Sequence, residues 1–280
     1  MIVLTAVLVM SVLINSVFIS FGEIEIVIID IGQGDCIFVR SLSGKSYLID
    51  CGSGNVNDIE KNRIVPFLKY KSVAELDFIL ISHTDKDHIS GVIGLLENFE
   101  VGTVVMPDIL FKEEVYNEIV EKAYEEGVMV EYFSKGDYIE DGLMKLACMH
   151  PPLDYGSTDS NSLSMVLQMK FKSFSALFTG DMTQKEEKLL VTSGVLDKID
   201  LLKVAHHGSK FSTCYDFLEV IRPDIAVVSC SKVNSYGHPD PDVMERLLVY
   251  TDSIYVTSEG GAITLRTNGE EVRVQEFIGR

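Results

Sequence analysis

Two histidines and two aspartates stand close together in the segment SHTDKDH, directly after a run of apolar residues. They are His83, Asp85, Asp87 and His88, and they include two of the six histidines in the chain. Imidazole and carboxylate groups together suit Zn²⁺, Mn²⁺ or iron, whereas all-oxygen ligand sets suit Mg²⁺ or Ca²⁺. The segment is therefore half of a candidate metal site. Taken alone, it is also typical of a capped turn between a strand and a helix.

Similar polar segments follow three other predicted strands. They are TGD, AHHGS and SYGHPD, which carry Asp181, His206, His207 and His238. Since α/β folds place functional side chains at the carboxyl ends of their strands, we expect the four segments to meet. Asp181 follows a glycine, which lets the backbone approach closely, and it is placed to bridge two metal ions about 4 Å apart. The combination favours a metal centre over four unrelated turns.

The elements that must position these residues are strands and helices from residue 23 onward. Three strands separated by glycine-containing turns come first, and strand–helix units follow; the second half repeats this order. The pattern predicts two sheets packed face to face with helices outside, in one domain. The predicted strands are 23–32, 36–41, 45–52, 78–83, 102–108, 162–171, 174–181, 200–208, 224–231, 253–258 and 262–266. The predicted helices are 58–71, 88–99, 111–127, 184–194, 213–221 and 240–250.

The composition limits the partners of the chain. A length of 280 residues suits one large α/β domain, and a formal net charge of −18 argues against a broad basic face for gripping duplex DNA. Such faces draw most of their affinity from neutralising phosphates. A nucleic acid held locally by metal ions and a few lysines remains compatible, with Lys203, Lys210 and Lys232 as candidate phosphate contacts. Five cysteines without CxxC spacing predict buried thiols and no disulfides.

The first twenty residues, MIVLTAVLVMSVLINSVFIS, contain no charged side chain. Their number is about what a helix needs to cross roughly 30 Å of hydrocarbon. They lack the basic start and the small-residue cleavage site of a signal peptide. We therefore predict a membrane-anchor helix over residues 1–22, with a buried core segment as the alternative, and a globular domain over residues 23–280. The absence of lysine or arginine just after the segment favours a location outside the cell membrane for that domain.

The motifs in chain order resemble the metallo-β-lactamase superfamily, and more narrowly the metallo-hydrolase domain of ComEC-type competence proteins. The matching segments are DIGQGDCIFV, LIDCG, SHTDKDHISG, NSLSMVL, LFTGD, LLKVAHHGSKFST and NSYGHPDP. The resemblance covers roughly residues 24–265. It implies a four-layer αββα sandwich and metal-dependent hydrolysis with two divalent ions, Zn²⁺ or Mn²⁺, along one edge. In ComEC proteins this domain is attached to a membrane channel that imports single-stranded DNA, and it is associated with degrading the other strand on the outer face.

The resemblance also implies the ligand set. The metal ligands are expected to be His83, Asp85, Asp87, His88, Asp181 and His207. Two positions depart from the superfamily pattern. Asp85 stands where a second histidine is usual, and this harder ligand shifts the preference from Zn²⁺ toward Mn²⁺. A histidine expected about twenty residues before the bridging aspartate is absent; Asn161 occupies that region and offers a weak contact to the metal or to a water. The stronger half of the site is then Asp87, His88, Asp181 and His207.

Other residues are assigned to the reaction. The predicted catalytic residues are Asp87, His206, Lys210 and His238. His206 is expected beside the ligand His207, as a support or a substrate contact. Ser209 and Lys210 follow at a predicted helix N-terminus, which is a natural place for phosphate. His238 is a candidate acid or transition-state contact.

Three functions are compatible with these residues. The first is a metal-dependent phosphodiesterase or DNase of the competence type, which acts on DNA at the outer face of the membrane beside an uptake channel. In it, Asp87 or Asp181 orients the attacking water. The second is an ester or lactone hydrolase on the same metals, which the acidic composition favours, whereas HHGSK and YGHP favour the first. The third is a catalytically weak DNA-uptake accessory module, against which the retained ligands weigh. The oligomeric state stays open.

Overall fold

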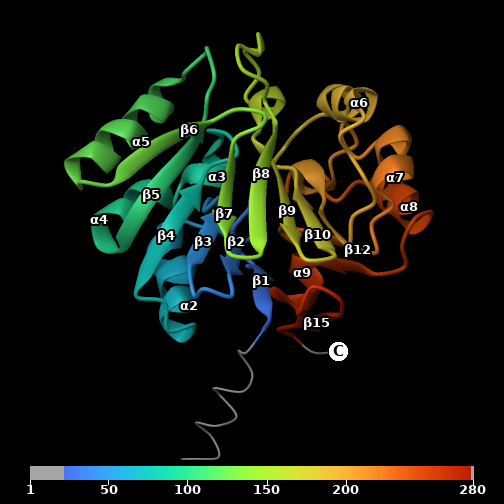
Figure 1. Cartoon of the computed structure of the whole chain (residues 1–280), viewed down its shortest axis with the longest axis horizontal. Helices are drawn as coiled ribbons and strands as arrows, with labels where there is room; N and C mark the ends of the chain where they lie inside the picture. The colour runs from blue at the N-terminus through green and yellow to red at the C-terminus, as the bar shows by residue number, and fades with distance from the viewer. Residues whose placement is uncertain (1–21, 279–280) are drawn as a thin grey trace, which may run out of the picture.

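The computed structural model describes residues 22–278, which form two β-sheets packed face to face with helices on both outer sides (Figure 1). Two mixed sheets between helices confirm the predicted α/β class. Except for Gly22, the membrane anchor predicted over residues 1–22 lies outside the described residues. Within residues 22–278, no helix combines the length and the apolar character needed to cross a bilayer.

The first sheet has eight strands in the order β15-β14-β1-β2-β3-β4-β5-β6. The strands are β1 Ile24–Ile28, β2 Ile37–Arg40, β3 Ser46–Ile49, β4 Glu75–Leu80, β5 Glu100–Pro107, β6 Met129–Phe133, β14 Ile263–Thr267 and β15 Val272–Glu276. β1 to β3 pair antiparallel, as expected for strands joined by short turns, and β3 to β6 pair parallel. Parallel neighbours need crossover connections, and these carry the helices on the outside of this sheet.

The second sheet has seven strands in the order β13-β12-β11-β10-β9-β8-β7. The strands are β7 Tyr138–Asp141, β8 Met144–His150, β9 Val166–Phe171, β10 Phe174–Phe178, β11 Leu201–Lys203, β12 Ile225–Val228 and β13 Ile254–Val256. β7 to β10 pair antiparallel and β10 to β13 pair parallel. The second half of the chain thus repeats the order of the first, as predicted.

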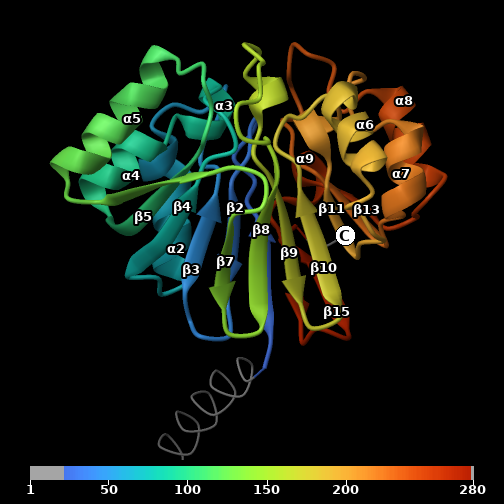
Figure 2. The same ribbon diagram turned by 45° about the horizontal axis from the view of Figure 1, so that its top comes forward.

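Helices cover the outer face of each sheet (Figure 2). Those on the first sheet are η1 Glu60–Ile64, α2 Val65–Tyr70, α3 Lys86–Ile89, α4 Val92–Asn98 and α5 Glu114–Glu125. The second half contains η2 Asn161–Leu163, α6 Gln184–Ser193, η3 Ala205–Gly208, α7 Tyr215–Ile221, α8 Pro241–Leu248 and α9 Thr257–Gly260. α6 begins with a capping box between Thr183 and Glu186 and ends at Gly194 in the left-handed conformation, where the sequence predicted its end.

The core lies in three layers. Ile26 and Ile263 of the first sheet and Leu167 and Ala176 of the second belong to one buried cluster between the sheets. Two further clusters lie between each sheet and its helices. The central strands are therefore buried on both faces, which explains their nearly continuous apolar sequences. All five cysteines are buried and free, as predicted.

Several boundaries differ from the sequence prediction. The strands β6, β7, β8 and β15 were not predicted. β6, β7 and β15 form sheet edges, and the exposed residues that such edges carry give a weak apolar signal; β6, for example, is mostly exposed. The predicted strand 200–208 ends at Lys203, and the start of the predicted strand 162–171 is the turn η2.

Candidate metal centre

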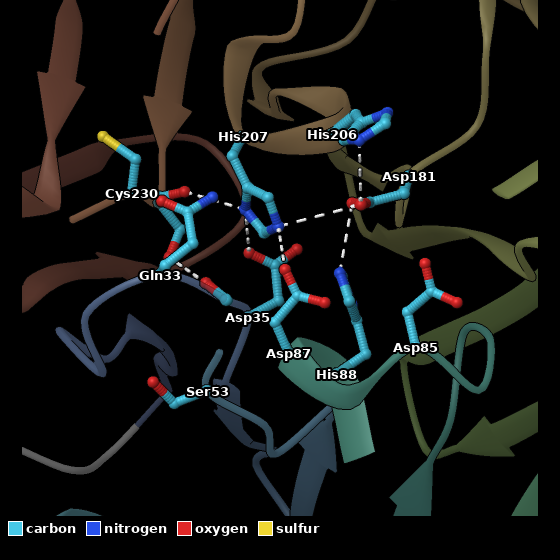
Figure 3. Close-up of polar contacts among 12 residues, drawn as sticks. Gln33, Asp35, Ser53, Asp85, Asp87, His88, Asp181, His206, His207 and Cys230 are labelled. Atoms are coloured by element: carbon cyan, nitrogen blue, oxygen red, sulfur yellow. Dashed lines mark hydrogen bonds and ion pairs between the residues drawn. The ribbon is translucent and has the colours of Figure 1, made fainter. Parts of the chain in front are cut away.

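Three of the four polar segments identified in the sequence meet in one cluster (Figure 3). SHTDKDH follows β4 and enters α3, Asp181 follows β10, and the two adjacent histidines form η3 after β11. His83, His88 and Asp181 each offer a ligand atom, and these atoms lie within 4.8 Å of one another; the same holds for Asp87, His88 and His207. Two overlapping groups of potential ligands therefore share one buried centre.

Close backbone approach brings the two sheets together at this point. The Ser82 carbonyl accepts a hydrogen bond of 2.7 Å from the Met165 amide, which joins the segment after β4 to the start of β9. Gly180 has a φ of +51°, and a Cβ there would lie 2.9 Å from the Ser82 Cβ. Glycine is therefore required immediately before Asp181, as the sequence pattern suggested.

Three buried histidines share one hydrogen-bonding arrangement. The Nδ1 atoms of His83, His88 and His207 lie 2.9, 2.8 and 2.9 Å from Ser82 Oγ, Asp50 Oδ2 and the Ser229 carbonyl oxygen. A carboxylate and a carbonyl only accept, and Ser82 Oγ already donates to Asp50, so each neutral ring carries its proton on Nδ1. The Nε2 atom of each ring is buried and has no hydrogen-bond partner. Metal-binding histidines are held in this way, so the three rings fit a bound metal ion.

Asp181 lies at the centre of the cluster. Its Oδ1 is 3.2 Å from His88 Nε2, and its Oδ2 is 3.7 Å from His207 Nε2 and 3.6 Å from His206 Nε2. Asp87 Oδ2 lies 3.3 Å from His207 Nε2 on the inner side. A carboxylate that faces several ligand nitrogens is suited to bridge two cations. The predicted bridging position agrees with this geometry, and the ligand assignment itself stays a prediction.

Asp85 lies on the outer side of the cluster. Its Oδ2 is 3.7 Å from His83 Nε2, and its side chain is 39% exposed, against 3% for Asp181. Ser160 Oγ donates a 2.7 Å hydrogen bond to the other Asp85 oxygen and fixes the carboxylate. Asn161 follows in η2, and its buried Oδ1 has no hydrogen-bond partner, which fits the predicted weak metal or water contact. The His83 and Asp85 side is thus the more open half of the site.

The carboxylates and histidines of the cluster shift one another's pKa values. Burial alone would raise the pKa of Asp181, but His88 and His207 hold it well below its usual range. Burial alone would lower the pKa of His88, but Asp181 and Asp50 raise it well above its usual value. Against the effect of burial, Asp181 and Asp35 raise the pKa of His207 to about 9. Ionised carboxylates held in a buried site favour positive charge. The protonated rings of His88 and His207 supply it in the metal-free chain, and divalent cations would supply it in their place, with mixed N and O ligands that suit Zn²⁺ or Mn²⁺.

The predicted phosphate contact of Lys203 and the predicted helix N-terminus at Ser209 and Lys210 are wrong. Lys203 is fully buried, and its Nζ donates to Asp35 Oδ2 at 2.7 Å, so it is unavailable to a substrate. Ser209 and Lys210 do not begin a helix, because α7 starts only at Tyr215. Lys210 and Lys232 are exposed.

His206 and His238 lie at the outer edge of the centre. The His206 side chain is 24% exposed, and its ring centroid is 5.6 Å from that of His238. Burial, together with His207 and His206, lowers the pKa of His238 to about 4. His238 is therefore neutral near pH 7, which favours the predicted role of a transition-state contact over that of an acid. His150 lies elsewhere: its Nε2 is 2.8 Å from the Ser162 carbonyl and supports η2.

Sequence reasoning assigned no role to two supporting carboxylates. Asp50 holds His88 Nδ1 and also accepts a 2.7 Å hydrogen bond from the Ser82 amide. Asp35 Oδ1 lies 3.5 Å from His207 Nδ1. Asp50, in LIDCG, directly follows β3, and Asp35, in DIGQGD, lies in the turn between β1 and β2; an aspartate beside a buried strand was the available signal. Their histidine partners are distant in sequence, so the sequence alone could not predict these contacts.

A two-sheet sandwich with a His/Asp centre at one edge defines a class of metal-dependent proteins. The chain belongs to the metallo-beta-lactamase superfamily, whose family model matches residues 29–232. The crystal structure of the metallo-beta-lactamase fold protein YhfI from Bacillus subtilis has a similar fold, with a TM-score of 0.54 and 12% identity over 85% of this chain and 98% of that one. At this identity the likeness shows the fold alone.

Within this superfamily, the chain is similar to competence proteins. The chain is 32% identical over 260 residues to ComE operon protein 3 of Bacillus subtilis, covering 88% of this chain and 33% of that protein. It is 27% identical over 259 residues to Competence protein ComA of Neisseria gonorrhoeae, covering 91% of this chain and 34% of that protein. The chain thus spans about a third of the length of these relatives. The predicted relationship to competence proteins is confirmed.

Proposed function

We propose that this chain is a metal-dependent phosphodiesterase that cleaves DNA. The observation that carries the proposal is the set of three buried histidines, His83, His88 and His207, whose unpartnered Nε2 atoms surround Asp181. When bound, two divalent cations would supply Lewis acidity and a lowered pKa for water, the chemistry that phosphodiester hydrolysis requires. Similarity to competence proteins supports DNA as the substrate class.

The residues of the chain divide the work in this proposal. Asp87 and Asp181 orient the attacking water, because both carboxylates face the ligand nitrogens at the centre. The partly exposed His206 and the neutral His238 stand at the outer edge, where they contact the phosphate oxygens or the leaving oxygen. Lys210 is exposed and contributes positive charge near the substrate rather than in the centre. Ordered donors of this kind stabilise charge that develops in the transition state.

The acidic composition favours a second candidate function. With a net charge of −18, the chain attracts no anionic polymer over its surface as a whole, which would suit an uncharged ester or lactone. The local charge differs, because the centre would carry cations and the adjacent segments 209–214 and 231–239 contain two lysines and no acidic residue. This local excess of positive charge supports the phosphodiester substrate.

Location and partners form a further part of the proposal. We propose attachment to the cell membrane through the apolar residues 1–22, with the catalytic domain on the outer face beside a DNA-uptake channel. The uncharged first twenty residues support the attachment. Relatives about three times as long support a partner or a further region for DNA uptake. Protease accessibility of the domain in intact cells and in lysed cells would test the orientation.

One experiment separates the functions. The metal-depleted chain is supplied with Mn²⁺ or Zn²⁺ and assayed on end-labelled linear DNA, bis-p-nitrophenyl phosphate, p-nitrophenyl esters and lactones. We expect DNA cleavage that falls by at least about 100-fold in Asp87→Ala, as losses of water-orienting groups do. The exposed Asp252→Ala is the matched control and should be unchanged. Turnover of esters alone would favour the second function, and no turnover with either metal would favour an accessory module.

A further inference from the structure

Four loops surround the metal centre, and each displays a large apolar side chain to solvent. The exposed fractions are 46% for Phe111, 63% for Leu153, 64% for Phe211 and 69% for Tyr236. A small pocket beside His83 is lined from segments 107–113 and 158–163, which places the first two loops next to the centre. The other two loops contain His206–Gly208 or His238. Figure 2 shows the loops around residues 155 (yellow-green) and 235 (dark orange) rising at the same edge.

Tyr236 lies in a loop whose backbone is held by hydrogen bonds. Its ring stacks on the His238 ring, with centroids 5.6 Å apart and an interplanar angle of 24°. The Asn234 side-chain oxygen accepts hydrogen bonds from the amides of Tyr236 and His238, at 3.1 and 2.9 Å, and its amide nitrogen donates to the His238 carbonyl. One face of Tyr236 therefore covers a residue of the site, and the ring is nonetheless largely open to solvent.

Phe211 is displayed from an equally constrained loop. Ser212 Oγ donates to the Ala205 and Ser209 carbonyls, both at 2.9 Å. The Phe211 carbonyl accepts a 2.9 Å hydrogen bond from the Gln184 amide. The next two residues, Ser212 and Thr213, are fully buried, so the exposed ring does not result from a loose chain. Lys210 Nζ lies 5.1 Å from the centroid of the ring.

The two loops form one continuous surface. The Asp240 amide donates a 2.8 Å hydrogen bond to the Gly208 carbonyl, and a Cβ at Gly208 would lie 2.7 Å from Pro239. Segments 209–214 and 231–239 contain Lys210 and Lys232 but no aspartate or glutamate, in a chain with a net charge of −18. The carboxylate of Asp240 is occupied as the cap of α8. Flat aromatic rings beside local positive charge are the features that bind unpaired nucleobases and their phosphates.

We propose that Phe211 and Tyr236 stack against unpaired bases of a single DNA strand whose phosphodiester reaches the metal centre. This inference rests on the proposed phosphodiesterase function and names the form of its substrate. Bases in a duplex are stacked on one another and cannot cover these rings. A chain with a net charge of −18 offers no broad basic face for the phosphates of a duplex, so stacking on rings displayed from fixed loops supplies the missing affinity. Lys210 and Lys232 pair with the adjoining phosphates.

The test compares ring removal with ring retention. Phe211→Ala and Tyr236→Ala remove a ring, and Phe211→Trp and Tyr236→Phe keep one. Tyr70→Ala removes a ring that is 79% exposed on α2, outside the segments that form the centre, and is the matched control. The probes are a fluorescein-labelled 12-mer of deoxythymidine, an abasic 12-mer with the same phosphates and a 12-base-pair duplex. Affinities for the three probes come from fluorescence anisotropy in EDTA, where hydrolysis plays no part. The kcat/KM for cleavage of the deoxythymidine strand is measured with Mn²⁺.

Each alanine variant at the site should lose at least about 5-fold in affinity for the deoxythymidine strand, the lower range for one base–aromatic stack. Affinity for the abasic strand should stay within about 2-fold, and the ring-retaining variants and Tyr70→Ala should bind like the original chain. This pattern supports the inference even if no metal supports hydrolysis, a result that would overturn only the proposed function. Equal losses on the abasic strand, an unchanged affinity for deoxythymidine, or losses confined to ester hydrolysis would overturn the inference.

Discussion

The buried ion pair between Lys203 and Asp35 offers a sharp test of how the centre is supported. Both side chains are about 1% exposed, and their charged atoms lie 2.7 Å apart. Lys203 lies at the end of β11, and Asp35 lies between β1 and β2, so the pair joins the two sheets. In Lys203→Met, Asp35 would keep its charge in a buried position, next to His207 but without its main partner.

The expected cost of this substitution is large. Removing one partner of a buried ion pair destabilises a protein by about 3–5 kcal/mol, because the other charge is left uncompensated. Lys198 and Asp224 form a pair at a similar distance, 2.8 Å, but their side chains are 62% and 52% exposed. Solvent screens such pairs, so Lys198→Met should cost at most about 1 kcal/mol. It is the matched control, since the same residue change is made in both cases.

Urea unfolding in EDTA, followed by circular dichroism, measures both costs without a contribution from bound metal. A double variant, Lys203→Met with Asp35→Leu, should recover part of the loss, because no charge is then left buried without its partner. If Lys203→Met costs no more than Lys198→Met, or if the double variant is less stable than Lys203→Met, the ion pair does not support the centre as described.

Three further predictions concern the ligands and the surface. Asp50→Asn should weaken Mn²⁺ or Zn²⁺ binding by about 10–100-fold in calorimetric titration, because Asp50 fixes the His88 ring; unchanged affinity would contradict this. Asp85→His should raise the affinity for Zn²⁺ relative to Mn²⁺, and an unchanged ratio would contradict the assigned role of Asp85. Burial raises the pKa of Glu25, but Lys71 and Arg266 lower it by more, so its net pKa is below 4.5. Ionised Glu25 therefore stabilises the folded chain above about pH 4.5, and this stabilisation is lost as the pH falls through the folded-state pKa of Glu25. Over that pH range, the difference in free energy of unfolding between the original chain and Glu25→Gln should shrink.

The sequence predicted the parts of the site that depend on local pattern. Short polar segments at strand ends located His83, Asp87, Asp181 and His207, since each such residue follows a recognisable apolar run. The fold class followed from the same alternation of strands and helices. These features depend on residues that lie within about one helix or strand of each other in the sequence, and the spacing of apolar residues is enough to predict them.

The remaining features depend on contacts between distant segments. The interaction of Lys203 with Asp35 spans 168 residues, and a lysine near HHGS therefore suggested a phosphate contact rather than a buried partner. The support of His207 Nδ1 by the Ser229 carbonyl involves the backbone, which leaves no signal in residue type. Edge strands such as β6 were missed because their exposed residues are those that an edge requires, not those typical of a buried strand.

The backbone at the two adjacent histidines explains how their side chains come to differ in burial. His206 and His207 have φ values of 51° and 55°, a left-handed conformation that costs a non-glycine residue about 1–3 kcal/mol. The surroundings hold it in place: the His206 amide donates to the Gly180 carbonyl, and the Gly208 carbonyl accepts from Asp240. The turn directs His207 inward, where it is 1% exposed with Nδ1 fixed by a carbonyl, and leaves His206 at the outer edge, 24% exposed. The inner histidine thus has the fixed Nδ1 and the buried, unpartnered Nε2 that suit a ligand. His206 Nε2 also lies 3.6 Å from Asp181 Oδ2, so the division into a ligand and a substrate contact stays a prediction.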